Sequence, residues 1–250
     1  ATSGELASGL VGEGRMAEPE AVVKFIEDDI LGNLPLRGKK ILITAGPTYE
    51  AIDPVRFIGN HSSGKMGFEI AKASANLGAE VILITGPTHQ KTNHSLIKVV
   101  PVVSAQEMYD AAHKYFNNVN IAILSAAVAD FTPKEVSSEK IKKAASTLNI
   151  ELTKTKDILE SLGQIKKQQY LVGFALETNN ELENAKGKLQ RKNLDAIVLN
   201  SLQDKGAGFA TDTNKITIID KDLNEKAFEL KSKVEVAKDI MNEIVTKINA

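Results

Sequence analysis

Short apolar runs alternate with stretches of helical spacing from residue 40 to about residue 200. Five runs are continuously apolar, as in strands buried on both faces: residues 41–43, 81–84, 121–124, 170–172 and 196–199. Apolar residues with a helical repeat predict helices over residues 64–77, 104–116, 157–165 and 181–190. This alternation predicts a Rossmann-like, doubly wound α/β fold with a mostly parallel sheet.

The two ends of the chain depart from this pattern. Residues 215–219 and 227–230 predict a hairpin or added strands, and the apolar positions of residues 234–248 predict a last helix. The first 14 residues are rich in Gly, Ser and Ala, which is typical of a linker. We interpret residues 1–36 as a linker or a remnant of a preceding domain, and residues 37–250 as the main domain.

Composition indicates a protein of the cytoplasm. The 250 residues carry 31 basic and 32 acidic side chains, so net charge gives no reason to expect a nucleic-acid or membrane partner. The absence of cysteine excludes disulfides, a thiolate nucleophile and a Cys-rich zinc site. The 4 histidines are scattered without the spacing of a metal pair, and no apolar run is long enough to span a bilayer.

The loop after the first strand carries the clearest binding signal. Residues 44–63 pass without clear periodicity, and this loop is longer than most connections in compact domains. Gly46 lets a ligand approach the backbone, and Ser62-Ser63-Gly64 opens a helix whose N-terminus suits phosphate. The segment also spells GxxxxGK, but Met66 stands where a Walker A loop needs Ser or Thr. The plain alternative is a capped helix after a long surface loop.

Two polar side chains of this loop could contact a ligand. Asn60 could hydrogen-bond a carbonyl or an amide, and Arg56 could clamp a phosphate or carboxylate with two hydrogen bonds. Taken singly, each residue type in a loop more commonly orders the loop or lies on the surface.

Later loops add small residues and cations. Ser125-Ala126-Ala127 leaves room beside the third strand, with Asp130 as the nearest acid. Residues 132–143 are polar and are expected to form a mobile flap that carries Lys140, Lys142 and Lys143. On the helix over residues 181–190 and just beyond it, Lys188 and Lys192 share one face. Such lysines close over phosphates or are simply solvated.

Taken together, these segments resemble the phosphopantothenate–cysteine ligase domain of coenzyme A biosynthesis. The matching stretches are ITAGPTYEAIDPVRFIGNHSSGKMGFEIA, SAAVADFTP with EKIKK, KTKDIL, VGFALETNN, KLQRKNLDAIVLN and GFATDTNKITII. In addition, LASGLVGEGRMAEPE resembles the end of the flavin-dependent decarboxylase domain that precedes the ligase in bacterial bifunctional proteins. Ser8 stands where that domain has a catalytic cysteine, so we expect a fragment without decarboxylase activity or FMN.

The resemblance implies a homodimeric ligase that shares its full-length polypeptide with a decarboxylase domain. Such an enzyme uses CTP and Mg²⁺ to convert the carboxylate of 4′-phosphopantothenate into an acyl-cytidylate, with release of pyrophosphate. The amine of L-cysteine then attacks, which gives phosphopantothenoylcysteine and CMP. Charge neutralisation and positioning are expected to carry most of the rate.

By position in the matching motifs, Asn60 and Lys140 are expected to be catalytic, and Arg56, Asn60 and Ala127 to bind phosphopantothenate. The resemblance and the loop analysis together give the nucleotide site, and no protein ligand to a metal is expected. The nucleotide-binding residues are Gly46, Ser62, Ser63, Gly64, Leu124, Ser125, Ala126, Asp130, Lys140, Lys156, Asp157, Ile158, Leu159, Phe174, Lys188 and Lys192. The family often has Asn-Pro before Asp157, where this chain has Thr155-Lys156.

Two other readings of the sequence stay open at this stage. A nicotinamide-dependent oxidoreductase needs GxGxxG after the first strand and an acid after the second. The chain instead has Ala45-Gly46-Pro47-Thr48 and Thr85-Gly86, which disfavours that class. A non-catalytic module would bind CTP without releasing pyrophosphate.

Overall fold

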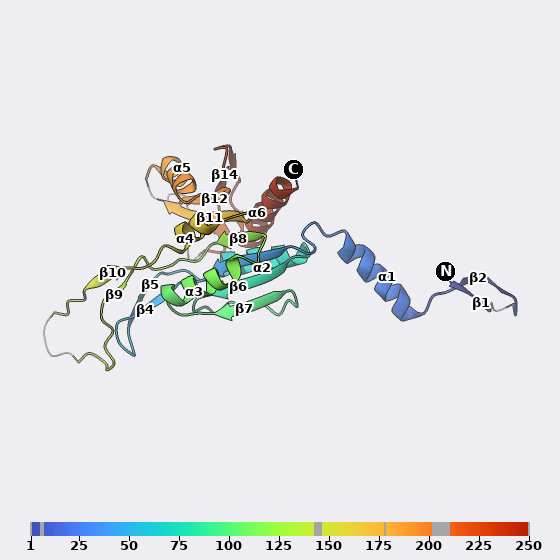
Figure 1. Ribbon diagram of the computed structural model, residues 1–250, viewed down its shortest axis with the longest axis horizontal. Helices are drawn as coiled ribbons and strands as arrows, with labels where there is room; N and C mark the ends of the chain where they lie inside the picture. Colours follow the sequence, from blue (N-terminus) through green and yellow to red (C-terminus); the bar gives the residue numbers. More distant parts are fainter. Residues whose placement is uncertain (1, 6–7, 143–146, 178, 202–210, 250) are drawn as a thin grey trace.

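The computed structural model describes residues 2–5, 8–142, 147–177, 179–201 and 211–249. Its centre is an eight-stranded sheet with the strand order β15-β14-β12-β11-β8-β3-β6-β7 (Figure 1). The strands are β3 (Lys40–Ala45), β6 (Glu80–Thr85), β7 (Ile97–Pro101), β8 (Ile121–Leu124), β11 (Tyr170–Glu177), β12 (Ala196–Ser201), β14 (Ile216–Asp220) and β15 (Glu225–Ala227).

The sheet confirms the predicted Rossmann-like fold. Strands β7, β6, β3, β8, β11 and β12 pair in parallel, and β14 and β15 add antiparallel pairs at one edge. Numbered along the chain, the parallel strands lie in the doubly wound order 3-2-1-4-5-6. The order reverses between β3 and β8, where such sheets bind ligands. Strand β7 was not predicted, because this edge strand lacks a fully buried residue.

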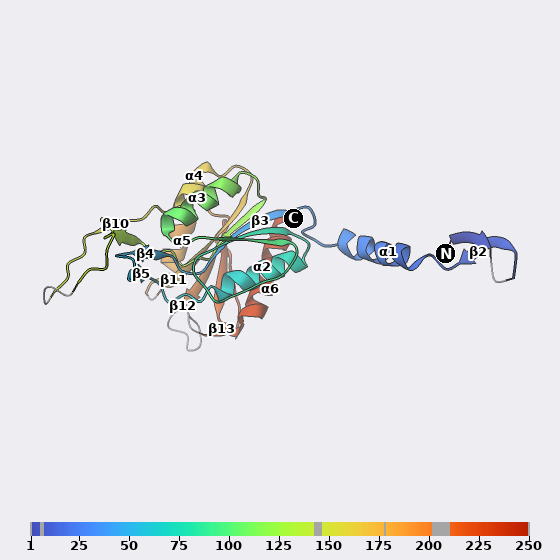
Figure 2. The same ribbon diagram turned by 90° about the horizontal axis from the view of Figure 1, so that it is seen from below.

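Helices cover both faces of the sheet (Figure 2). One face packs against α2 (Lys65–Asn76) and α6 (Lys233–Ile248), and the other against α3 (Ala105–Phe116), α4 (Ile158–Ile165) and α5 (Glu181–Arg191). The predicted helices therefore agree with the structure to within a few residues. Hydroxyl caps start two of them: Ser104 accepts from Glu107 N, and Ser232 forms a full capping box with Glu235.

Two small hairpins extend from the carboxyl end of the sheet (Figure 1). The 44–63 segment, which shows no clear periodicity, contains the first pair, β4 (Tyr49–Ala51) and β5 (Phe57–Gly59). The rings of Tyr49 and Phe57 stack across this hairpin, with centroids 3.8 Å apart. The hairpin was not predicted, because its short strands lack an alternating apolar pattern. The base of the predicted flap is the second pair, β9 (Phe131–Pro133) and β10 (Leu152–Lys154).

The C-terminal hairpin differs slightly from the prediction. Its second arm is β15 rather than residues 227–230, because a tight turn follows β14 directly. Leu223 takes a left-handed conformation there (φ 64°), and Asp220 N donates to Asn224 O. A further short pair, β13 (Thr213–Asn214) with β16 (Lys231–Ser232), connects the hairpin to the start of α6.

The N-terminal segment lies away from the sheet (Figures 1 and 2). It contains the hairpin of β1 (Thr2–Glu5) and β2 (Val11–Arg15), followed by α1 (Pro19–Gly32). The side chains of Val22, Val23, Phe25 and Ile26 in α1 are exposed, Phe25 to 72%. The interpretation of residues 1–36 as a linker or remnant stays a prediction. Among the described residues, no helix combines the length and apolar character needed to span a membrane.

Candidate functional site

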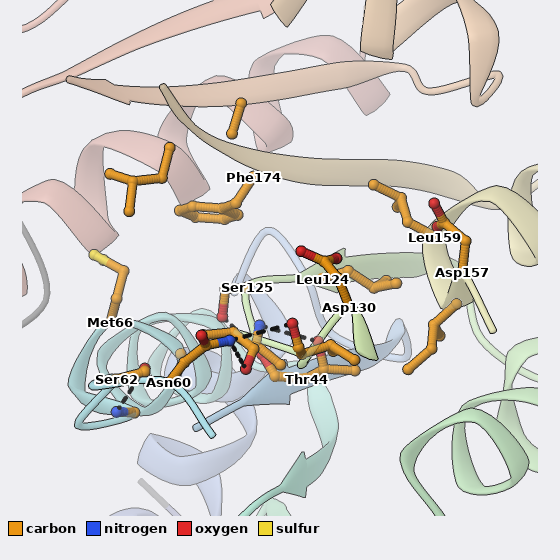
Figure 3. A pocket seen from close by; sticks show the side chains of 18 of the residues that line it. Thr44, Asn60, Ser62, Met66, Leu124, Ser125, Asp130, Asp157, Leu159 and Phe174 are labelled. Carbon is orange, nitrogen blue, oxygen red and sulfur yellow. Dashed lines mark hydrogen bonds between the residues drawn. The ribbon is translucent and has the colours of Figure 1, made fainter. Parts of the chain in front are cut away.

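A cavity of about 780 Å³ opens at the carboxyl ends of β3 and β8. Its wall continues along the ends of β11 and β12 and the starts of α2 and α4. Figure 3 shows Met66 and Ser62 on one side of the cavity, Asp157 and Leu159 on the other, and Phe174 facing the floor. Its volume is at the upper end of the range for ligand pockets, large enough for a nucleotide with a second substrate.

The floor is a small-residue loop that β3 holds in place. Ser125 Oγ donates to the carbonyl of Thr44 at 2.7 Å, and Thr44 Oγ1 accepts from Ala126 N at 3.3 Å. Thr48 Oγ1 accepts from Ala129 N at 2.9 Å. These bonds fix the backbone after β8 before any ligand binds.

Asn60 joins two loops beneath the cavity. Its Nδ2 donates to the carbonyls of Ala127 (2.9 Å) and Val128 (3.2 Å) (Figure 3). Both amide hydrogens are therefore committed to the backbone, and Oδ1 is the group left for a ligand. In this conformation Asn60 can accept a hydrogen bond from a substrate but has no hydrogen to donate to a carbonyl.

The start of α2 depends on two close glycines. Gly64 precedes the helix in a left-handed conformation (φ 77°), and a Cβ there would lie 3.2 Å from the Cα of Gly46. Ser62 Oγ accepts from Gly64 N at 3.3 Å. Gly46 was predicted to bind the nucleotide, but it does not line the cavity. It packs against Gly64 at the turn before α2 instead.

Lys188 of α5 and Lys192, the residue that caps the C-terminus of α5, reach the cavity. Lys188 Nζ donates to the carbonyl of Phe174 at 2.8 Å, and Lys192 pairs with Asp157. Burial, and then the charge of Lys192, lower the pKa of Lys188. Burial opposes ionisation of Asp157, but hydrogen bonds from Lys192 and from the backbone of Glu160 outweigh it and lower its pKa. A bound anion would favour the charged form of Lys188.

Apolar and aromatic groups lie between the cationic ones. Ile158 and Leu159 are buried at the start of α4, and Phe174 lies across the cavity from Asn60 (Figure 3). Lys156 Nζ lies over the ring of Tyr109, 4.7 Å from its centroid. This wall can hold a flat base beside a phosphate-binding surface.

Lys140 and Arg56 do not line the cavity in this conformation. Lys140 is exposed on the flap; Lys143, predicted with it, lies outside the described residues. Arg56 pairs with buried Asp53 and donates from Nη2 to Ile141 O at 2.9 Å, while Ile141 N donates to Asp53 at 3.1 Å. The Arg56 hydrogen bond lowers the pKa of Asp53 against the effect of burial. Arg56 thus fastens the flap to the β4–β5 hairpin.

All other predicted site residues line the cavity. They are Asn60, Ser62, Ser63, Gly64, Leu124, Ser125, Ala126, Ala127, Asp130, Lys156, Asp157, Ile158, Leu159, Phe174, Lys188 and Lys192. Their individual roles stay predictions.

Further polar residues line the cavity that the sequence did not indicate. They are Thr44, Lys65, Lys154, Thr155, Glu160, Asn200, Asn214 and Lys233. Asn200 could have been found, because it directly follows the predicted strand over residues 196–199. Asn214 and Lys233 carry no local signal, because antiparallel pairing of β13 with β16 brings them to the cavity.

No three His, Asp or Glu side chains among the described residues form a group that could hold a metal ion. Mg²⁺ usually keeps several waters and binds through one or two carboxylates and substrate phosphates, so an ion in this cavity would be held mainly by the phosphates.

A doubly wound sheet with a lysine-rich cavity at its switch point is typical of α/β proteins that bind phosphorylated ligands. Residues 36–248 match the family described as DNA/pantothenate metabolism flavoprotein C-terminal domain, and the chain belongs to this family.

Curated relatives match this sequence, and a solved structure matches the fold as well. The chain is 54% identical to a "Cysteine/Cysteine sulfinic acid decarboxylase" of an unknown prokaryotic organism, over 99% of this chain and 70% of the relative. It is 47% identical to the "Coenzyme A biosynthesis bifunctional protein CoaBC" of Bacillus subtilis (strain 168), over 97% of this chain but only 60% of that protein. A crystal structure of the C-terminal domain of CoaBC matches with TM-score 0.75 and 43% identity, covering 87% of this chain and 99% of that one. Because these names describe different reactions, the choice between the two activities depends on the residues of the site.

Proposed function

We propose that this chain joins 4′-phosphopantothenate to L-cysteine at the expense of CTP, through a 4′-phosphopantothenoyl-cytidylate intermediate. The charge of the cavity carries the proposal. Six lysines line it against three carboxylates, of which Asp157 is already paired with Lys192. A triphosphate, a phosphomonoester and the carboxylate of an amino acid bound in one cavity need such an excess of cations. The bifunctional CoaBC relatives and the CoaBC C-terminal domain structure support the ligase assignment over a decarboxylase.

The residues act by positioning and charge. Lys188 and Lys192 would bind phosphates, and Phe174 with Leu159 would hold the base. Asn60 would orient the reacting groups, with its Oδ1 as the available atom. Lys140 would join the phosphates when the flap closes. The carboxylate of phosphopantothenate attacks the α-phosphorus and pyrophosphate leaves; the amine then attacks the activated carbonyl and CMP leaves.

The test follows pyrophosphate in the absence of cysteine. The protein is incubated with 4′-phosphopantothenate, Mg²⁺ and each nucleoside triphosphate in turn. Release with CTP that becomes catalytic when cysteine is added is the expected result. Release with ATP alone would overturn the choice of nucleotide. Binding of CTP without pyrophosphate release would favour a non-catalytic nucleotide-binding module.

The proposal includes a homodimer with a decarboxylase domain on the same full-length polypeptide, acting in the cytoplasm. Apolar side chains on and beside the β4–β5 and β9–β10 hairpins are exposed: Val55, Phe57, Phe131, Val136 and Leu152. A second copy covering this patch would bring its own Arg56 beside the shared surface. Inactive Asn60 and Arg56 variants should then recover activity on mixing. No recovery would show that each protomer is self-contained.

A further inference from the structure

Four polar lining residues of the cavity have no role in the site expected from the sequence. We call Lys65, Asn200, Asn214 and Lys233 the α6 cluster, because α6 begins at Lys233. The pairing of β13 with β16 sets Asn214 opposite Lys231, and Lys233 N donates to the carbonyl of Asp212 at 2.9 Å.

Two helices begin at this cluster. Lys65, the first residue of α2, pairs with Asp212 at 2.6 Å, and this ion pair ties the start of α2 to the start of α6. Both helix N-termini add positive potential to that of the lysines. The cluster therefore attracts an anion, but this property alone does not distinguish a phosphate from a carboxylate.

The side-chain amide of Asn214 helps to distinguish between these two kinds of anionic ligand. Its Nδ2 donates to Asn200 Oδ1 at 3.3 Å, and the residue is only 2% exposed. Among the described residues, Asn214 Oδ1 is the buried side-chain polar atom without a hydrogen-bond partner. Buried acceptors are normally paired, so this oxygen calls for a ligand that donates a hydrogen.

Lys233 supplies the complementary charge. The residue is 4% exposed, and burial followed by the charge of Lys65 lowers its pKa, with Asp212 acting in the opposite direction. An anion beside it would favour its charged form. A fully ionised phosphate could pair with Lys233 but offers no hydrogen to Asn214, so the cluster fits a ligand with a donor next to an anionic group.

We propose that the α6 cluster is the subsite for the amino-acid substrate, with Asn214 Oδ1 accepting a hydrogen bond from the α-amine and Lys233 pairing with the carboxylate. This assignment rests on the proposed ligase function. A hydrogen bond from one N–H to Asn214 points the lone pair of the neutral amine away from that residue. The amine nitrogen forms the amide bond, CMP leaves with the electron pair of the broken C–O bond, and the surplus proton passes to water.

The experiment compares cysteine with cysteamine, which has the amine but lacks the carboxylate. With CTP and phosphopantothenate saturating, the wild-type protein should prefer cysteine. Lys233→Met should lower kcat/KM for cysteine about 100-fold and leave that for cysteamine unchanged, because the lost ion pair needs the carboxylate. Lys238→Met, an exposed lysine of the same helix, is the matched control and should change neither value.

Asn214→Ala should lower kcat/KM about 10-fold for both amines, and Asn214→Asp, which keeps an acceptor, should retain more activity. Pyrophosphate release without an amine should stay at the wild-type rate in every variant, which also shows that the variants fold. Slowed release in Lys233→Met would mean that the cluster binds phosphate and would overturn the assignment. Equal losses with cysteine and cysteamine in Lys233→Met would do so as well. A wild-type protein that releases no pyrophosphate would instead overturn the ligase function itself.

Discussion

The cavity has one lysine group at α5 and another in the α6 cluster. The two groups differ in whether the polar side chains around them already have hydrogen-bond partners within the protein. On α5, Lys188 donates to a carbonyl and Lys192 holds Asp157, so each ammonium has its position fixed by the protein. In the α6 cluster, Asn214 keeps a buried acceptor without a partner among the described residues. The α5 group is thus preorganised to stabilise charge, whereas the α6 cluster is completed by its ligand. Variants that separate these two properties test the comparison.

The largest effect is expected from the α5 group. Lys188→Gln removes a buried ammonium from the proposed phosphate site, and CTP-dependent pyrophosphate release should fall about 1,000-fold. Lys186→Gln is the matched control, because Lys186 lies on the same helix but pairs with Glu225 outside the cavity. Equal rates for wild type and Lys188→Gln would remove α5 from the phosphate site.

Asn60→Asp should slow product formation about 100-fold, because the catalytic groups lose their alignment. A carboxylate there would face the carbonyl oxygens of Ala127 and Val128, which now accept hydrogens from the amide. Pyrophosphate release and product formation are measured separately. Asn60→Ala removes the tether without adding charge, so it should be less severe. If both steps run at the wild-type rate in Asn60→Asp, the tether has no part in turnover.

Gly163→Ala should reduce the free energy of unfolding by about 2 kcal/mol, the usual cost of overpacking. A Cβ at Gly163 would lie 2.0 Å from the carbonyl of Lys192, so the end of α5 must move. Gly187→Ala is the control on α5, since nothing lies within 4 Å of its Cβ, and it should be neutral or stabilising. Urea unfolding measures both variants. An unchanged midpoint for Gly163→Ala would show that α5 shifts freely.

The smallest effect is expected at an ion pair away from the cavity. Asp220 accepts from Lys247 Nζ at 2.7 Å and from Asn224 N at 2.9 Å. Burial raises the pKa of Asp220, but these hydrogen bonds outweigh it and lower the pKa to about 2.

A lowered pKa stabilises the fold above the unfolded value of about 4, and this contribution disappears as the pH falls to about 2. Asp220→Asn should therefore cost about 1–2 kcal/mol at pH 7, and much less at pH 2. Exposed Asp222→Asn is the control, and denaturant unfolding at both pH values measures the difference. A deficit that does not depend on pH would contradict the charge-based explanation.

Much of the site follows from local sequence. Continuous apolar strands followed by small residues placed Ser125 and Ala126, and the helix-opening Ser62-Ser63-Gly64, at one end of the sheet. Parallel strands make this possible, because their carboxyl ends meet at the same edge. By contrast, the role of Gly46 depends on the approach of Gly64, and that of Arg56 on its contact with Ile141, 85 residues away.

The sequence alone determined the α/β class, the family resemblance and the lysines of α5, since each is written in a periodicity or a contiguous motif. The tertiary structure decided which atoms remain available. It committed the hydrogens of Asn60 to two carbonyls, and it brought Asn214 and Lys233 to the cavity through antiparallel pairing. Hydrogen-bond satisfaction and burial depend on residues far apart in the chain, and no local pattern encodes them.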